Sequence, residues 1–127
     1  MEHESIGRVE EFTRDGRNFI YIDLSNLRTN EDFIKITGTI EPLIANYPGC
    51  SVYTITNIEN VRFDTDSKKL FTRYMEHNKP YVKYGAVFGL DGIKKIMAST
   101  VFAQSGRKNM VFAFSKEQAI ELLLKQK

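Results

Sequence analysis

The sequence predicts an α/β domain built on a mostly parallel five-stranded sheet. Segments rich in β-branched and aromatic residues alternate with segments whose apolar residues recur every three to four positions. The length of 127 residues suits one domain, and no linker, repeat or low-complexity segment divides residues 1–127. Alternating strands and helices require parallel pairing with right-handed crossovers. We therefore expect a β-hairpin followed by the order α-β-α-β-α-β-α.

A β-hairpin is expected near the N-terminus. Asp15-Gly16 is a strong short signal for a tight turn between two strands. The segment FIYIDLSNL at 19–27 follows this turn, and its β-branched and aromatic residues indicate a strand. Residues 6–13 precede the turn, so we expect them to form the antiparallel partner strand at the edge of the sheet.

The first helix is expected over residues 30–47. Its apolar residues have the spacing of one helix face. They are Phe33, Ile36, Ile40, Leu43, Ile44 and Tyr47. Thr29 or Asn30 can cap the helix. Gly38 and Pro42 weaken it, so we expect a kink near Pro42 or two shorter helical pieces.

Three further strand–helix pairs follow. Strands are expected at 50–58, 81–89 and 109–114, and helices at 67–78, at 91–104 and after Ser115. The periodicity of the 91–104 helix predicts which of its side chains point inward. These are Ile93, Ile96, Met97, Thr100 and Val101.

The strand at 50–58 has an uneven pattern. Tyr53 and Ile55 would lie on one face of the sheet, and Thr54 and Thr56 on the other. Central parallel strands are usually apolar on both faces, so the threonines suggest a thinly covered face that is open to water, a ligand or a partner. Threonine is also an ordinary strand former, and this second interpretation stays open.

The composition of the chain limits the classes of protein to which it can belong. Apolar residues make up 42% of the chain, no apolar stretch is long enough to span a bilayer, and the acidic start MEHESIGRVEEF is unlike a signal peptide. The single cysteine, Cys50, excludes an intrachain disulfide. We therefore expect a cytoplasmic protein.

The net charge of +2 hides an asymmetry between the two halves of the chain. Residues 1–60 carry 5 Lys/Arg and 10 Asp/Glu, whereas residues 61–127 carry 13 Lys/Arg and 6 Asp/Glu. Solvated helix faces explain this pattern, and so do an anionic partner or self-association as a homodimer. No basic cluster of a known nucleic-acid-binding type is present, so no nucleic-acid partner is expected.

The sequence lacks the usual signatures of an enzyme. His3, His77 and Cys50 are too scattered for zinc, and no G-x-S-x-G or Walker A pattern occurs, so neither a metal, a cofactor nor catalysis is expected. A glycine-containing turn at 85–92 lacks the tight G-x-G of a dinucleotide site. Asp91 in that turn is interpreted as a helix N-cap beside amides that can hold an anion.

The stretch Asp64-Thr65-Asp66-Ser67 precedes a helix and is the main candidate site. Asp, Thr and Ser are preferred N-cap residues, so a cap alone explains the stretch. The loops at the carboxyl ends of parallel strands gather at one edge of the sheet, where such folds bind ligands. We therefore also predict a recognition edge, for a protein partner or a ligand. Its candidate residues are Asn57, Asp64, Thr65, Ser67 and Asp91.

The order of elements and two runs, VKYGAVFGLDGIKKIM and KNMVFAFSKEQAIELLL, resemble the SpoIIAA-like proteins of the STAS superfamily (sulfate transporter and anti-sigma factor antagonist). The resemblance covers roughly residues 6–125. It implies a curved sheet with four main helices packed mainly on one face. It also implies a non-enzymatic regulatory role through a protein partner.

The resemblance assigns a role to Thr65. Anti-sigma factor antagonists are phosphorylated within a D-S-[ST]-G-type motif, and Asp64-Thr65 falls on its Asp-Ser pair. Thr65 is thus the implied phosphorylation site, while Asp66-Ser67 replaces the following hydroxyl and glycine. Ser67 is a second hydroxyl that a kinase could modify. Some relatives of this layout resemble CRAL-TRIO lipid-binding folds, so a carrier of a small apolar or lipid-like ligand is the alternative function.

Overall fold

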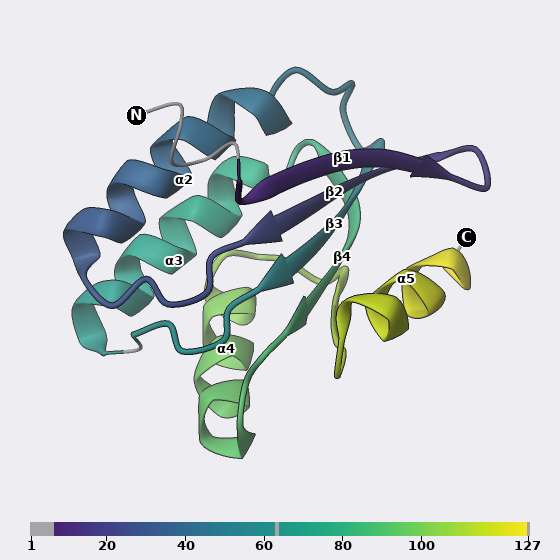
Figure 1. Ribbon diagram of the computed structural model, residues 1–127. Coiled ribbons are helices and arrows are strands. Elements are labelled where there is room, and N and C mark those ends of the chain that lie inside the picture. The colour runs from purple at the N-terminus through teal and green to yellow at the C-terminus, as the bar shows by residue number, and fades with distance from the viewer. Residues whose placement is uncertain (1–6, 63, 127) are drawn as a thin grey trace.

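The computed structural model describes residues 7–62 and 64–126 of the chain. Within these ranges the strands and helices follow the order that the sequence predicts (Figure 1). The elements are β1 (Val9–Arg14), β2 (Arg17–Asp23), α2 (Asn30–Ile44), β3 (Val52–Asn57), α3 (Thr65–Asn78), β4 (Val82–Phe88), α4 (Gly92–Gln104), β5 (Met110–Phe112) and α5 (Lys116–Leu124).

The strands lie in the sheet in chain order, β1-β2-β3-β4-β5. β1 pairs antiparallel with β2, and the other three pairings are parallel. Each parallel crossover steps in the same direction, so right-handed crossovers place their helices on one face of the sheet. α2, α3 and α4 form this layer, and α5 lies on the opposite face (Figure 1). The expected sheet, with its helices mainly on one face, is confirmed.

The turn between β1 and β2 has the predicted geometry. Asp15 and Gly16 have φ angles of 53° and 75°. Positive φ at both central residues is typical of a type I′ turn, whose twist matches that of the flanking strands. The predicted hairpin is confirmed.

The helix α2 is one continuous element. The Thr29 hydroxyl accepts a hydrogen bond from the Asp32 amide at 3.1 Å and caps the helix. The helix then runs through Pro42 to Ile44, so the expectation of two shorter pieces is wrong. Pro42 has no backbone N–H to donate, but it lies in the last turn of α2, so the missing hydrogen bond weakens only the end of the helix.

An apolar core lies on each face of the sheet. The larger one fills the space between the sheet and α2, α3 and α4, and includes Ile20, Ile22, Phe33, Ile36, Ile40, Ile44, Val52, Phe71 and Val101. The smaller one lies under α5 and contains Phe19, Tyr53, Ile55, Ala86, Ala113, Ala119, Ile120 and Leu123.

Two polar contacts also join α5 to the β1–β2 hairpin. Arg17 Nη1 donates to the Leu123 carbonyl at 2.8 Å, and Lys116 forms an ion pair with Glu10 at 2.7 Å.

The threonines of β3 do not mark a thinly covered face. Thr54 and Thr56 are buried on the same side as Val52, under the layer of three helices. The opposite face has the lighter cover, because α5 is the helix that packs there and Tyr21, Tyr84 and Phe88 stay half-buried around it. The interpretation of threonine as an ordinary strand former is therefore the correct one.

The inward face of α4 agrees only in part with the predicted one. Val101 is buried and Met97 half-buried as expected, but Ile96 is 71% exposed and Thr100 is exposed. Ala98 and Phe102 are buried in addition, and the Ile93 side chain lies outside the described residues. The Phe102 ring packs 5.6 Å from the ring of Phe112 on β5. This pairing of two large rings turns the helix so that Ile96 faces solvent.

Candidate functional site

Two loops at the carboxyl ends of the strands are joined by backbone hydrogen bonds. The amides of Leu24 and Asn26, after β2, donate at 2.8 and 2.9 Å to the carbonyls of Asn57, the last residue of β3, and of Glu59, which follows it. These bonds extend the pairing of β2 and β3 beyond the sheet. The loop that precedes α3 is therefore held against its neighbour.

Asn26 and Asn60 fix the turns of these two loops. Both residues have left-handed φ angles, 64° and 58°, which asparagine tolerates better than most residues. Asn60 Nδ2 donates to Asn26 Oδ1 at 2.9 Å, and Arg28 Nη1 donates to Asn60 Oδ1 at 3.3 Å. No local pattern in the sequence predicts that these two asparagines pair with each other.

The Asn57 side chain supports the loop from inside. Its Oδ1 accepts a hydrogen bond from the Glu59 amide at 3.0 Å. Gly89, after β4, packs against the same segment. A Cβ at Gly89 would lie 2.7 Å from the Glu59 nitrogen, and the φ angle of 96° also favours glycine. Asn57 thus shapes the candidate site without presenting its oxygen to a partner.

Asp64 and Ser67 form a reciprocal capping box at the start of α3. Asp64 Oδ1 accepts a hydrogen bond from the Ser67 amide at 2.9 Å, and Ser67 Oγ accepts one from the Asp64 amide at 2.7 Å. Arg62 Nε lies 2.5 Å from Asp64 Oδ2. The hydrogen bond from the Ser67 backbone, helped by Arg62, lowers the pKa of the Asp64 carboxyl below its ordinary value. Ser67 is buried, whereas Thr65 and Asp66 are exposed on the first turn.

Asp91 performs the same task for the next helix. Its carboxylate accepts a hydrogen bond from the Lys94 amide at 2.9 Å and caps α4. The Lys94 ammonium reaches back to the carbonyl of Val61 at 3.5 Å. Four of the five predicted site residues therefore share the β3–α3 connection and the start of α3, and the Asp91 loop packs beside that connection.

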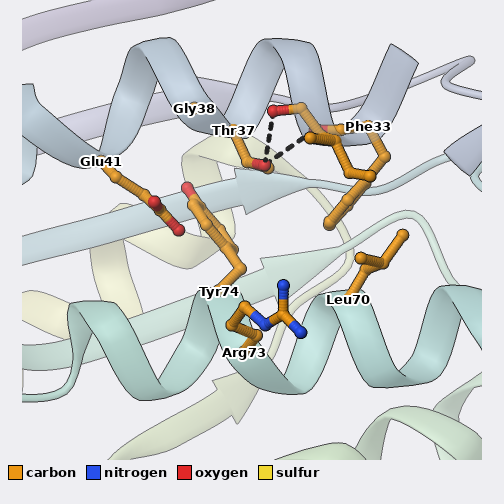
Figure 2. A pocket seen from close by; sticks show the side chains of 8 residues that line it. Phe33, Thr37, Gly38, Glu41, Leu70, Arg73 and Tyr74 are labelled. Atoms are coloured by element: carbon orange, nitrogen blue, oxygen red, sulfur yellow. Dashed lines mark hydrogen bonds between the residues drawn. The ribbon is translucent and has the colours of Figure 1, made fainter. Parts of the chain in front are cut away.

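A groove of about 160 Å³ lies between α2 and α3 (Figure 2). It is lined by Phe33, Ile34, Thr37, Gly38, Glu41, Leu70, Arg73 and Tyr74. Gly38 helps to open it, because no atom lies within 4 Å of the place where a Cβ would stand. Ile34 beside it is 54% exposed. The helical spacing predicted Phe33 on the apolar face of α2, but the groove between α2 and α3 depends on tertiary packing.

The groove contains a buried hydroxyl. The Tyr74 hydroxyl has no hydrogen-bond partner of good geometry among the residues that the structure describes. Burial raises the pKa of Tyr74 well above its ordinary value, and the nearby Asn78 side chain opposes this shift. Glu41 and Arg73 flank the ring with opposite charges (Figure 2). The groove therefore combines apolar walls with a buried hydroxyl and a charged rim.

Comparisons with known proteins bear on the fold. No protein-family model matches the chain, and no curated protein matches it. A solved structure described as an anti-sigma-factor antagonist (STAS) domain protein from Planctomyces limnophilus superposes with a TM-score of 0.56. The match covers 91% of this chain and 98% of that one, at 12% sequence identity. The chain has the STAS fold. The resemblance that the sequence indicated is thereby confirmed for the architecture.

Two features are absent from the described part of this STAS-like domain. Across residues 7–62 and 64–126, no group of three His, Cys, Asp or Glu side chains is placed to hold a metal ion. In the same ranges, no helix is both long and apolar enough to cross a membrane. The chemistry at the start of α3 is that of hydrogen bonding and charge.

Proposed function

We propose that this STAS-like domain, acting as one unit over residues 1–127, is a non-enzymatic regulatory domain that binds a protein partner. The observation that carries the proposal is the open apolar groove between α2 and α3, with Ile34 exposed beside it. The solved structure of the same fold is described as an anti-sigma-factor antagonist domain protein, which supports a role in protein binding.

The groove has the makeup of a small protein interface. Interfaces combine an apolar centre with a polar rim. Phe33, Leu70 and Ile34 would supply the centre here, and Glu41 and Arg73 the rim. An apolar side chain of the partner would enter the groove, and a polar group beside it would accept a hydrogen bond from the Tyr74 hydroxyl.

The first turn of α3 would form the second half of the contact. Thr65 lies five positions before Leu70, about 8 Å along the helix axis. Thr65 and Asp66 are exposed. Asp64 and Ser67 hold this turn in place through the capping box, Asn57 holds the loop before it, and Asp91 caps the adjacent helix. At 3.6 residues per turn, Asp66 shares the helix face of Leu70, and Thr65 lies further around the same turn. A partner that fills the groove and wraps around the first turn of α3 would contact both residues.

Thr65, rather than Ser67, is the hydroxyl that we propose for phosphorylation. Ser67 is buried, and its hydroxyl accepts a hydrogen bond from the Asp64 amide and donates one to the Asp64 carbonyl, whereas Thr65 faces solvent. A phosphate on Thr65 would add about two negative charges at a helix N-terminus, which the dipole favours and Asp66 opposes. The added charge would stand on the first turn of α3 and change the affinity for a partner that contacts this turn.

The test places a photo-crosslinking amino acid at Ile34 in the full chain, in native cells. The matched control places the same group at Ile96, which is also an exposed isoleucine but lies on α4. We expect one protein to be crosslinked from position 34 and not from position 96, and the product to be lost in Gly38→Leu, which fills the groove.

Two outcomes would contradict the proposal. Equal products from positions 34 and 96 would mean that the groove has no selectivity. A product that consists of two copies of this chain would make the groove a homodimer interface and would replace the heterologous partner.

A further inference from the structure

A second groove lies between α4 and β5, and its polar side is cationic. It encloses about 450 Å³ and is lined by Ser99, Phe102, Ala103, Gly106, Arg107, Lys108, Met110 and Phe112. The rings of Phe102 and Phe112 stand 5.6 Å apart and form an apolar wall. A volume of this size suits a small organic ligand.

Arg107 is buried in this groove without a counter-ion. Its exposed fraction is 5%, and none of the ion pairs among the described residues includes it. Nε donates to Asn109 Oδ1 at 3.1 Å, and Nη1 donates to the Met75 carbonyl at 3.3 Å. Nη2 meets the thioether sulfur of Met110 at 2.9 Å, and a thioether is a weak acceptor. Burial lowers the pKa of Arg107 to about 10, which still leaves it charged at neutral pH.

A buried charge is costly unless it is paired. The neutral acceptors around Arg107 do not supply that pairing. Two more cations stand nearby. Lys108 lines the groove, and the Lys79 ammonium lies 2.7 Å from the position where a Cβ on Gly106 would be. No carboxylate in the described ranges forms an ion pair with either lysine. The groove thus joins an apolar wall to uncompensated positive charge.

We propose that this groove binds a small amphiphilic anion, a carboxylate with an aliphatic body of medium length. The carboxylate would displace the weak contact of Arg107 Nη2 with Met110 and pair with the guanidinium. The aliphatic body would lie against Phe102 and Phe112. The apolar lining disfavours inorganic phosphate. Ser99 alone offers too few hydrogen-bonding groups to recognise a nucleotide base. This site lies on α4 and β5 and does not depend on the groove between α2 and α3.

The first experiment compares ligands by isothermal titration calorimetry on the full chain. Decanoate, kept below its micellar concentration, supplies both the body and the charge. 1-Decanol supplies the body alone, and acetate the charge alone. We expect saturable binding of one decanoate, at least tenfold tighter than either comparison compound. Equal affinity for 1-decanol, or no saturable binding of decanoate, would overturn the proposal. Binding to phosphatidylglycerol vesicles without binding to decanoate would assign the charge to a membrane surface and would also overturn it.

The second experiment locates the site with variants. Arg107→Met should weaken decanoate binding at least tenfold. Ala103→Trp fills the groove from its exposed rim and leaves Arg107 in place, so it decides the question even if Arg107→Met does not fold. Gln104→Trp is the matched control, because Gln104 is exposed on the same helix but does not line the groove. Unchanged decanoate affinity in Ala103→Trp would overturn the proposal. Crosslinking from position 34 should be the same in Ala103→Trp and in the natural chain, so this test is independent of the proposed function.

Discussion

Asp64 and Ser67 each accept a hydrogen bond from the backbone amide of the other, at 2.9 and 2.7 Å. This pair bears on both interpretations of residues 64–67, the helix cap and the recognition edge. The cap is present, and it divides the stretch into two residues that hold α3 and two, Thr65 and Asp66, that face solvent. The recognition that we propose therefore depends on the exposed pair, Thr65 and Asp66, and on the rigidity that the capping pair, Asp64 and Ser67, supplies.

The Asp64 cap is predicted to make stability depend on acid pH. Asp64→Asn should lower the melting temperature by a few degrees at pH 7, because the carboxylate is the better acceptor for the Ser67 amide. The folded-state pKa lies below the ordinary value of 3.8, so the folded state binds fewer protons than the unfolded state between the two values. The stabilisation is full above the unfolded pKa and is lost as pH falls through the folded one. Thermal melts from about pH 2 to pH 7 should show the two proteins converging in acid; a constant gap would contradict this account.

The two hydroxyls of the stretch are predicted to differ in their effect on stability. Ser67→Ala should lower the free energy of unfolding by about 1 kcal/mol, because it leaves the Asp64 amide without its buried acceptor. Thr65→Ala should change it by less than about 0.5 kcal/mol, as is usual for an exposed position. Urea denaturation of both variants measures the difference. The reverse order would make Thr65 the structural hydroxyl and remove the argument for its modification.

Gly38 is predicted to separate stability from partner binding. Gly38→Ala should raise the free energy of unfolding by about 0.5–1 kcal/mol, because alanine is the better helix former and its Cβ meets open space. Gly38→Leu should fold equally well but lose crosslinking from position 34. Urea denaturation and the crosslinking assay, run on both variants, test this pair. A Gly38→Ala variant less stable than the natural chain would mean that α2 requires glycine for another reason.

The left-handed turn at Asn60 is predicted to be sensitive to the side chain. Asn60→Ala should cost about 1–2 kcal/mol, because alanine is strained at a φ of 58° and loses the contacts to Asn26 and Arg28. Asn60→Gly relieves the strain and should cost less. The difference between the two variants in urea denaturation isolates the backbone term. Equal costs would show that the hydrogen bonds alone matter.

Local signals in the sequence were sufficient for most of the architecture. The Asp15-Gly16 turn and the alternation of strand and helix patterns predict the hairpin and the parallel crossovers. The spatial order of the strands, β1-β2-β3-β4-β5, comes from the structure alone. Side-chain direction was harder. Ile96 fits the helical period of α4 as well as Ala98 does, and only the packing of Phe102 on Phe112 decides between them.

The candidate site was predicted in part. Asp64, Ser67 and Asp91 are cap residues by type and position, and the structure confirms them as caps. The pairing of Asn26 with Asn60 joins residues 34 positions apart, and the groove between α2 and α3 depends on the missing side chain of Gly38. Such features depend on how two elements pack against each other, so the residue pattern within one element does not predict them.

The bond between Arg17 and Leu123 has a kinetic consequence. Strands that neighbour each other in the chain also neighbour each other in the sheet, so the sheet closes short loops and is expected to assemble early and quickly. Arg17 and Leu123 are 106 residues apart, and their contact closes a loop around nearly the whole domain. Docking of α5 should therefore be the slow, late step of folding. Until it is complete, Phe19, Tyr53 and Ile55 remain uncovered, and an intermediate at this stage would be the species most prone to aggregate.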